Sequence, residues 1–369
     1  MSDNTQNQTS ETLQSEMNCK GCGSTLTYAP GTTVLKCQHC GAENEIEIST
    51  EEIEEIDFEK FLSEKNTDEI QEEIRTVRCN GCGAETTFDP NLVSDDCAFC
   101  GTPLVIKDGT TKKIIRPKSL LPFAIDSEKA FGLFREWLNK LWWAPNKLKK
   151  FARNHEQLKG MYIPYWTYDS KTHSVYTGQR GEHYNESESY TENGESKTRQ
   201  VQKTRWHHVS GRVRNIFDDL LVLASHSLPK DKTDKLEPWD LHNLVPFDEK
   251  FLSGYKAESY QVDLKEGFGE AKVKMESEIR ETVRRDIGGD EQRVTSVSTK
   301  YDDITFKHLL LPIWISAYKF KGKVYRFVVN GRTGEVQGER PYSWIKITLA
   351  VVAGLILAGA VYYLIKMNG

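Results

Sequence analysis

The chain has 369 residues, with 49 Lys and Arg against 54 Asp and Glu, which gives a formal net charge of -5. This length is enough for two to three domains. A charge so close to balance argues neither for nor against binding to nucleic acid. The first sixteen residues are polar, with no basic start and no apolar run, and they predict a disordered tail rather than a signal peptide.

All the cysteines belong to one pattern that occurs twice, Cys-x2-Cys, fourteen residues, then Cys-x2-Cys. Four thiolates satisfy the tetrahedral preference of zinc with no position left open. This spacing favours two structural Zn²⁺ ions over disulfides or an iron–sulfur site. The expected ligands of the first ion are Cys19, Cys22, Cys37 and Cys40, and those of the second are Cys79, Cys82, Cys97 and Cys100.

Each cysteine repeat predicts a zinc ribbon. A ribbon of about thirty residues buries too little apolar surface to fold alone, so metal binding would supply much of its folding free energy. With four cysteines on each ion no ligand position remains for water, so zinc hydrolysis is not expected. Metal-bound, reduced thiols indicate a cytosolic environment.

The two ribbons are separated by an acidic connector. Residues 41–75 hold fourteen Asp and Glu against three Lys and Arg. Ile53, Ile56, Phe61 and Leu62 lie at roughly helical spacing. We expect a solvated helix that docks lightly on a ribbon. A helix that binds a partner is the alternative.

The charge reverses after the second ribbon. Residues 112–159 carry twelve Lys and Arg against four Asp and Glu. Asp126 or Ser127 is a candidate N-cap for a helix that reaches about Leu141. Basic and aromatic side chains follow it, and three interpretations stay open: core tryptophans with solvated lysines, contact with an anionic membrane surface or a partner, and contact with nucleic acid. The residues concerned are Trp142, Trp143, Lys147, Lys149 and Lys150.

The region 160–341 predicts one mixed α+β domain with an antiparallel sheet. Residues 161–176 and 309–329 are rich in aromatic and β-branched residues, as strands are. Residues 180–204 are polar and predict a long exposed hairpin or loop. A helix is expected over about 264–285, where Gly288 and Gly289 end it. Residues 330–334 predict a turn between two strands.

The last apolar run, Ile347 to Ile365, contains no charged residue. Its nineteen residues are long enough to span a bilayer core of about 30 Å. We expect a single membrane helix that anchors the protein by its tail, with the large N-terminal part cytosolic at the inner face of the plasma membrane. A repeat of small residues every four positions suggests pairing of this helix with a second copy. The expected anchoring residues are Trp344, Ile347, Leu349, Val351, Val352, Leu355, Ile356, Leu357, Val361, Tyr362, Tyr363, Leu364 and Ile365.

The resulting domain boundaries follow the chain in order. They are a tail (1–16), zinc ribbon 1 (17–48), the acidic connector (49–76), zinc ribbon 2 (77–108), a basic aromatic helical segment (109–159), the α+β domain (160–341) and the transmembrane anchor (342–369).

Motifs of common catalytic sites are absent from the sequence. It contains no G-x4-G-K-[ST] phosphate loop, no G-x-S-x-G elbow and no H-E-x-x-H pair. The thiols that would serve as nucleophiles are assigned to metal. We therefore expect a protein that is not an enzyme.

Several motifs together resemble a family of bacterial membrane proteins with tandem zinc ribbons. These are the cysteine repeats, the run from Leu121 to Lys147, Val209-Ser210-Gly211, the segment Arg284–Asp290, and Pro312-x-Trp314 before the last helix. Members are often labelled primosomal protein N′ (replication factor Y), a superfamily II helicase. The missing phosphate loop argues against that activity here. Related proteins are encoded beside phage-shock protein A and SPFH proteins, and the resemblance implies a membrane anchor in envelope stress response.

The sequence therefore favours a zinc-binding scaffold that recruits membrane-associated proteins to the bilayer, with phage-shock or SPFH-like proteins as the implied partners. The alternative is a zinc-ribbon protein that binds nucleic acid. The second ribbon argues against that alternative, because residues 79–101 carry four acidic side chains and no Lys or Arg.

Overall fold

The computed structural model describes residues 17–63, 71–87, 94–105, 110–143, 145, 158–192, 195–320, 323–339 and 342–368. The fold is mixed α+β with antiparallel sheets, as the sequence predicts. The expected disordered tail, and Lys147, Lys149 and Lys150, lie outside the described residues.

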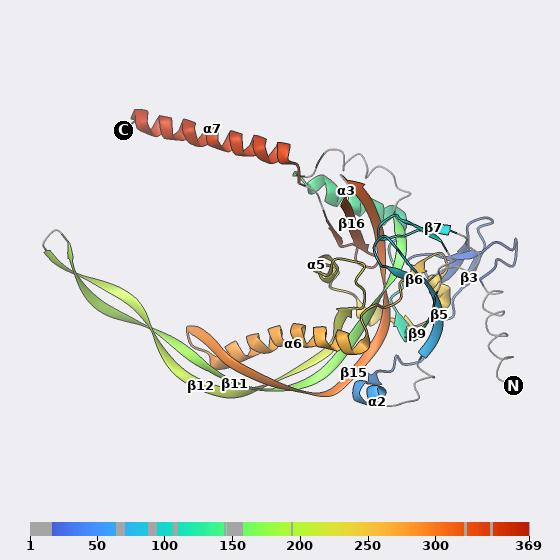
Figure 1. The fold of residues 1–369 in the computed structure, drawn as a ribbon, viewed down its shortest axis with the longest axis horizontal. Coiled ribbons are helices and arrows are strands. Elements are labelled where there is room, and N and C mark those ends of the chain that lie inside the picture. The colour runs from blue at the N-terminus through green and yellow to red at the C-terminus, as the bar shows by residue number, and fades with distance from the viewer. Residues whose placement is uncertain are drawn as a thin grey trace.

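A mixed sheet dominated by antiparallel pairs organises the molecule (Figure 1). Its main path runs β12-β11-β15-β10-β13, and three further strands pair with β11 or β15 while β17 extends β16. The strands are β4 (Ile56–Asp57), β10 (Ser119–Leu120), β11 (Lys159–Glu192), β12 (Glu195–Leu223), β13 (Val245–Pro246), β14 (Lys256–Ala257), β15 (Glu291–Phe320), β16 (Lys323–Asn330) and β17 (Val336–Gly338).

Three of these strands continue far beyond the core as a curved arm (Figure 1). β11 pairs with β15 out to Gly181 opposite Glu291, and beyond that point β11 pairs with β12 alone as far as Glu192 opposite Glu195. The predicted exposed hairpin over 180–204 is therefore confirmed. Strong twisting of long strands accounts for the curvature of the arm.

Helix α6 (Leu264–Ile287) fills the concave side of the arm (Figure 1). Asp263 caps its first turn by accepting a hydrogen bond from the Glu266 N–H, and Gly288, at a φ of 64°, ends it. Its buried stripe packs on the inward-facing side chains of β11 and β12. The predicted helix is thus confirmed and extends two residues further. The fully buried residues of the stripe are Ala271, Met275, Ile279 and Val283.

Helix α3 (Ser127–Lys140) covers another part of the sheet. Asp126 caps it, as predicted, and Phe134 stacks on Phe327 of β16 with ring centroids 3.9 Å apart. The rest of the segment 109–159 is not helical where it is described. Residues 110–115 form β9 (Thr110–Ile115), whose β-branched residues pair with β5 (Gln71–Arg78).

The ribbons carry the remaining strands. Ribbon 1 is the sheet β1-β2-β3, and ribbon 2 combines the sheet β6-β5-β9 with the pair β7-β8. Short helices complete the fold. The bounds are β1 (Leu26–Tyr28), β2 (Val34–Cys37), β3 (Glu43–Glu45), β6 (Glu85–Thr87), β7 (Ser94–Asp96), β8 (Pro103–Val105), α2 (Phe58–Ser63), α5 (Lys230–Thr233), η3 (Asp234–Leu236), η4 (Leu241–Asn243) and η5 (Glu249–Leu252).

The acidic connector differs from the expected helix on a ribbon. Its only described helix is the six-residue α2, and it docks on the central sheet through β4, which pairs with β15. Phe58 is buried there between Tyr168, Phe268 and Phe306. Phe61 packs on Phe306 as well, so two aromatic rings and the β4 pairing attach the otherwise acidic segment to the sheet.

His308 is a buried titratable residue of the core. Its side chain lies between Trp166 and Tyr260, and its Nδ1–H donates to the Ile115 carbonyl at 2.7 Å. Its Nε2 is buried without a partner among the described residues. Burial lowers the pKa of His308 to about 4, because protonation would place a charge in the core.

We expect this histidine to make the fold sensitive to acid. The unfolded chain binds the proton near pH 6.5 and the folded chain only near pH 4, so the contribution of His308 to stability is complete above pH 6.5 and falls by about 3 kcal/mol towards pH 4. Urea unfolding in detergent at pH 7 and pH 5 measures this change. The His308→Gln variant, which keeps a donor for Ile115, should lose less stability than the wild type over this interval. Equal losses would contradict the assignment.

Candidate metal centres and membrane helix

The first cysteine repeat converges as predicted. Cys19 and Cys22 follow the start of ribbon 1, and Cys37 and Cys40 follow the end of β2. The Sγ atoms of Cys19 and Cys40 are 3.4 Å apart, and those of Cys22 and Cys37 are 3.5 Å apart. Backbone hydrogen bonds from Gly23 and Gly41 to Cys19 and Cys37 close the two turns. All four sulfurs form one group.

The second repeat has the same geometry. The Sγ atoms of Cys79 and Cys100 are 3.5 Å apart, and those of Cys82 and Cys97 are 3.6 Å apart. The glycines at 83 and 101 repeat the hydrogen bonds of the first site. The two sites thus share the same tight turns, each closed by a glycine N–H that donates to the carbonyl of the first cysteine of its pair.

The donor set and its spacing fit a metal ion. A tetrahedral site with Zn–S bonds of about 2.3 Å has sulfurs about 3.8 Å apart, close to the distances seen in both groups. A disulfide needs sulfurs about 2.0 Å apart, and all eight cysteines are free. Two four-cysteine groups that can hold metal ions are therefore present, with no ligand position left over in a tetrahedral site.

Local hydrogen bonds prepare some of these thiols for metal. The Ser24 side chain, followed by the Ser24 backbone, lowers the pKa of Cys22 to about 6. A hydrogen bond with Cys97 lowers the pKa of Cys82 to about 5. Because the thiolate is the form that binds metal, these hydrogen bonds favour metal binding at both sites.

Helix α7 (Trp344–Asn368) contains the predicted anchoring residues. Among the described residues it is the one helix long and apolar enough to cross a membrane, and none of this span is buried inside the protein. In Figure 1 it leaves the sheet domain as a single straight rod. It begins three residues before the predicted apolar run, so that Trp344 lies in its first turn.

Trp142 and Trp143, at the end of α3, lie beside the start of α7. The Ser343 N–H donates to the Trp143 carbonyl at 2.8 Å, and Lys346 Nζ donates to the Trp142 carbonyl at 3.0 Å. Trp142 is 73% exposed and Trp344 is 79% exposed. The structure thus brings two predicted site regions, 200 residues apart in sequence, to one place, and Trp142 is not part of the core.

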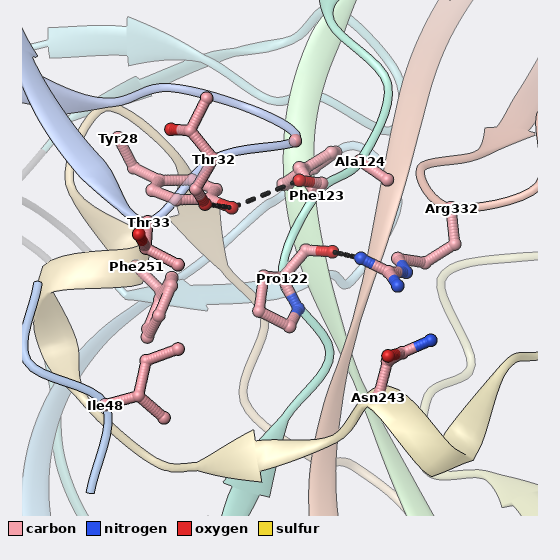
Figure 2. A pocket seen from close by; sticks show the side chains of 11 residues that line it. Tyr28, Thr32, Thr33, Ile48, Pro122, Phe123, Ala124, Asn243, Phe251 and Arg332 are labelled. Atoms are coloured by element: carbon pink, nitrogen blue, oxygen red, sulfur yellow. Dashed lines mark hydrogen bonds between the residues drawn. The ribbon is translucent and has the colours of Figure 1, made fainter.

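A hollow of about 560 Å³ lies between ribbon 1 and the sheet domain (Figure 2). On one side Tyr28 donates to the backbone carbonyls of Thr32 and Phe123, and on the other Arg332 donates to the Pro122 carbonyl at 3.1 Å. Arg332 is also paired with Asp240. The described lining contains no carboxylate, imidazole or thiol, so we assign no chemistry to it.

Sequence reasoning missed an acidic cluster at the base of the arm. Glu55, Asp169 and Asp218 approach one another there. The nearly buried Lys307 pairs with Glu55 at 3.2 Å and with Asp219 at 2.6 Å. Burial and then the hydrogen bond with Glu55 raise the pKa of Asp169 to about 7. Since Lys307 already supplies a cation, we assign no metal to this cluster. No sequence motif marks this cluster, because Glu55, Asp169 and Asp218 are far apart in the chain and meet only in the folded sheet.

Comparison with known proteins gives one relative and no assignment. No protein-family model matches the sequence, and no solved structure matches it. A protein of Bacillus subtilis strain 168 described as "Uncharacterized protein YdjG" is 28% identical over 359 residues, which span 95% of this chain and 96% of that protein. The similarity therefore extends over nearly the whole length of both chains, and it carries no activity with it.

We expect the purified full-length protein to carry two metal ions per chain. Elemental analysis by mass spectrometry after gel filtration in detergent measures this ratio. The Cys19→Ser/Cys22→Ser double variant should fall to one ion, because two sulfurs rarely hold a structural ion. A matched Ser24→Ala variant keeps all ligands and should retain two. A ratio near zero in freshly prepared wild type would contradict the assignment of both sites.

Proposed function

We propose that this protein is a non-enzymatic, zinc-binding scaffold that α7 anchors in the plasma membrane, and that it recruits partner proteins to the cytosolic face. The observation that carries the proposal is the junction between α3 and α7. There, exposed tryptophans from two parts of the chain surround the start of an apolar helix that packs on nothing else among the described residues.

The junction has the composition of a membrane interface. Tryptophan and tyrosine side chains favour the headgroup layer, and lysines near helix ends extend towards it. Trp142, Trp344 and Tyr342 are exposed here, and Lys346 lies among them. Of the three interpretations of this segment, the arrangement supports contact of Trp142 with lipid. It is less consistent with a tryptophan in the core or with one that binds nucleic acid.

Zinc is the metal that the sites favour. Thiolate ligands in a tetrahedral set of four are typical of structural zinc, and iron is the main competitor. When bound, the ion supplies folding free energy rather than chemistry. The residues that would hold it are the eight cysteines of the two groups. Thiols kept reduced by metal support a cytosolic position for the ribbons.

Recruitment of other proteins is supported by the shape of the molecule. The arm extends well beyond the core, and its outer half is only two strands wide (Figure 1). Two-stranded ribbons are marginally stable by themselves, and exposed strand edges are common binding surfaces. The sequence resembles proteins encoded beside phage-shock protein A and SPFH proteins. That resemblance suggests those proteins as the first partners to test, and a role in envelope stress response.

We expect charges in α7 to release the protein from membranes. Leu355→Arg and Ile356→Arg lie near the centre of the span, where each arginine costs about 2.5–3.5 kcal/mol of insertion free energy. The double variant should move to the soluble fraction after carbonate washing. The matched Leu355→Ile/Ile356→Leu variant should stay with the membrane. If the arginine variant stays as well, α7 is not the anchor.

The recruitment function is tested by affinity capture of the full-length protein from gently solubilised membranes, before and after nuclease treatment. We expect membrane-associated proteins whose recovery is insensitive to nuclease and is lost in the Leu355→Arg/Ile356→Arg variant. Recovery that depends on nucleic acid, and binding that weakens steeply with salt, would support the nucleic-acid alternative and contradict the scaffold.

A further inference from the structure

The two four-cysteine groups share their geometry but not their surroundings. In the first group Cys19 and Cys37 are buried, whereas Cys22 and Cys40 are exposed. In the second group Cys79 and Cys97 are buried and the other two cysteines are half-buried. Two cysteines of the first site are therefore exposed, whereas no cysteine of the second site is exposed to the same degree.

The turns between the cysteines show the same contrast. Gln38 and His39, between Cys37 and Cys40, are both exposed. At the equivalent positions of the second site Ala98 is 6% exposed and Phe99 is fully buried in the core of the sheet domain. The first site thus ends in a polar turn in solvent, and the second ends in an apolar turn inside the protein.

Contacts with the sheet domain hold the second site on several sides. Arg326 of β16 donates to the Phe99 carbonyl at 2.9 Å, and Gln261 donates to the Gly83 carbonyl at 3.2 Å. The Ser259 N–H donates to the Glu85 carbonyl at 3.0 Å. Each of these hydrogen bonds falls within three residues of a cysteine, so movement of a ligand would disturb the domain.

Ribbon 1 is attached by its other end. The Ser253 hydroxyl donates to the Leu26 carbonyl, and the Tyr28 N–H donates to the Ser253 carbonyl. The Gly31 N–H donates to the Phe123 carbonyl. These contacts fasten β1 and the turn that follows it, and they leave Cys22 and Cys40 exposed. Cys22 or Cys40 can therefore leave the ion without breaking these hydrogen bonds between ribbon and domain.

We propose that the first four-cysteine group is an exchangeable metal site, open to thiol and nitrogen donors from solvent, and that the second holds its ion permanently as part of the core. The proposal rests on metal binding by both groups. In the exchange step a donor from solution would bind the ion as the bond to Cys22 or Cys40 breaks; an incoming thiol gives up its proton on binding, and that proton passes to the released thiolate or to the buffer. No electron transfer is involved.

The test is the rate at which zinc leaves the full-length protein in detergent. The protein is loaded with Zn²⁺ to two ions per chain and mixed with excess 4-(2-pyridylazo)resorcinol, a chelating dye that reports zinc by its absorbance. We expect two phases of equal amplitude whose rates differ by at least about tenfold, which corresponds to about 1.4 kcal/mol in barrier height.

Variants assign the two phases. Cys40→Ser should abolish the fast phase and leave the slow one. Arg326→Ala, which removes the hydrogen bond to Phe99 without touching a ligand, should accelerate the slow phase only. His39→Ala, the matched change at the first site, should alter neither.

Two outcomes would overturn the proposal. One is release of both ions in a single phase. The other is loss of the fast phase on substituting Cys100 rather than Cys40. A protein that never loads two ions would instead contradict the assignment of the metal sites themselves, so the failure of the two proposals can be told apart. Circular dichroism before mixing confirms that each variant is folded.

Discussion

The antiparallel pairing of β11 with β15 is the constraint on which the rest of the structure depends. It runs from Lys159 opposite Ile315 to Gly181 opposite Glu291. Near its inner end these two strands accept β10, β14 and β16 as further partners, and the connector attaches to β15 through β4. At its outer end it carries α6 and the two-stranded hairpin (Figure 1). One ladder therefore links the arm to the part of the molecule that contains the two four-cysteine groups.

The metal sites are coupled to this ladder unequally. Ribbon 2 shares its apolar core with β11 and β15, since Cys79, Cys97 and Phe99 pack in the same cluster as Ile163 and Leu311. Ribbon 1 packs with α3 and the turn after β10, and the same cluster includes Tyr162 of β11 and Leu310 and Trp314 of β15. Both ribbons therefore share apolar core with the β11–β15 ladder. They differ at the second cysteine turn, which is buried at Ala98 and Phe99 in ribbon 2 and exposed at Gln38 and His39 in ribbon 1. The second site is therefore the more closely tied to the core.

The sequence predicts those features whose cause is local. Cysteine spacing specifies both metal groups, helical periodicity and caps specify α3 and α6, and a long apolar run specifies α7. The sequence does not predict features that depend on contacts between residues far apart in the chain. The acidic residues of 41–75 suggested a solvated helix, yet the rings of Phe58 and Phe61 dock the segment on strands that come more than 100 residues later. The identity of β9 as a strand depends in the same way on its pairing with β5.

The connection between sheet and membrane helix has a mechanical consequence. Phe327 of β16 stacks on Phe134 of α3, and the residues that follow α3 bind the first turn of α7 through the carbonyls of Trp142 and Trp143. These steps are a stacked pair of rings, a backbone hydrogen bond from Ser343 and a side-chain hydrogen bond from Lys346. If α7 spans a bilayer, these contacts constrain the orientation of α3, and with it that of the sheet, relative to the membrane plane. Such an attachment would suit the proposed role, in which the arm is presented to partners at a defined angle.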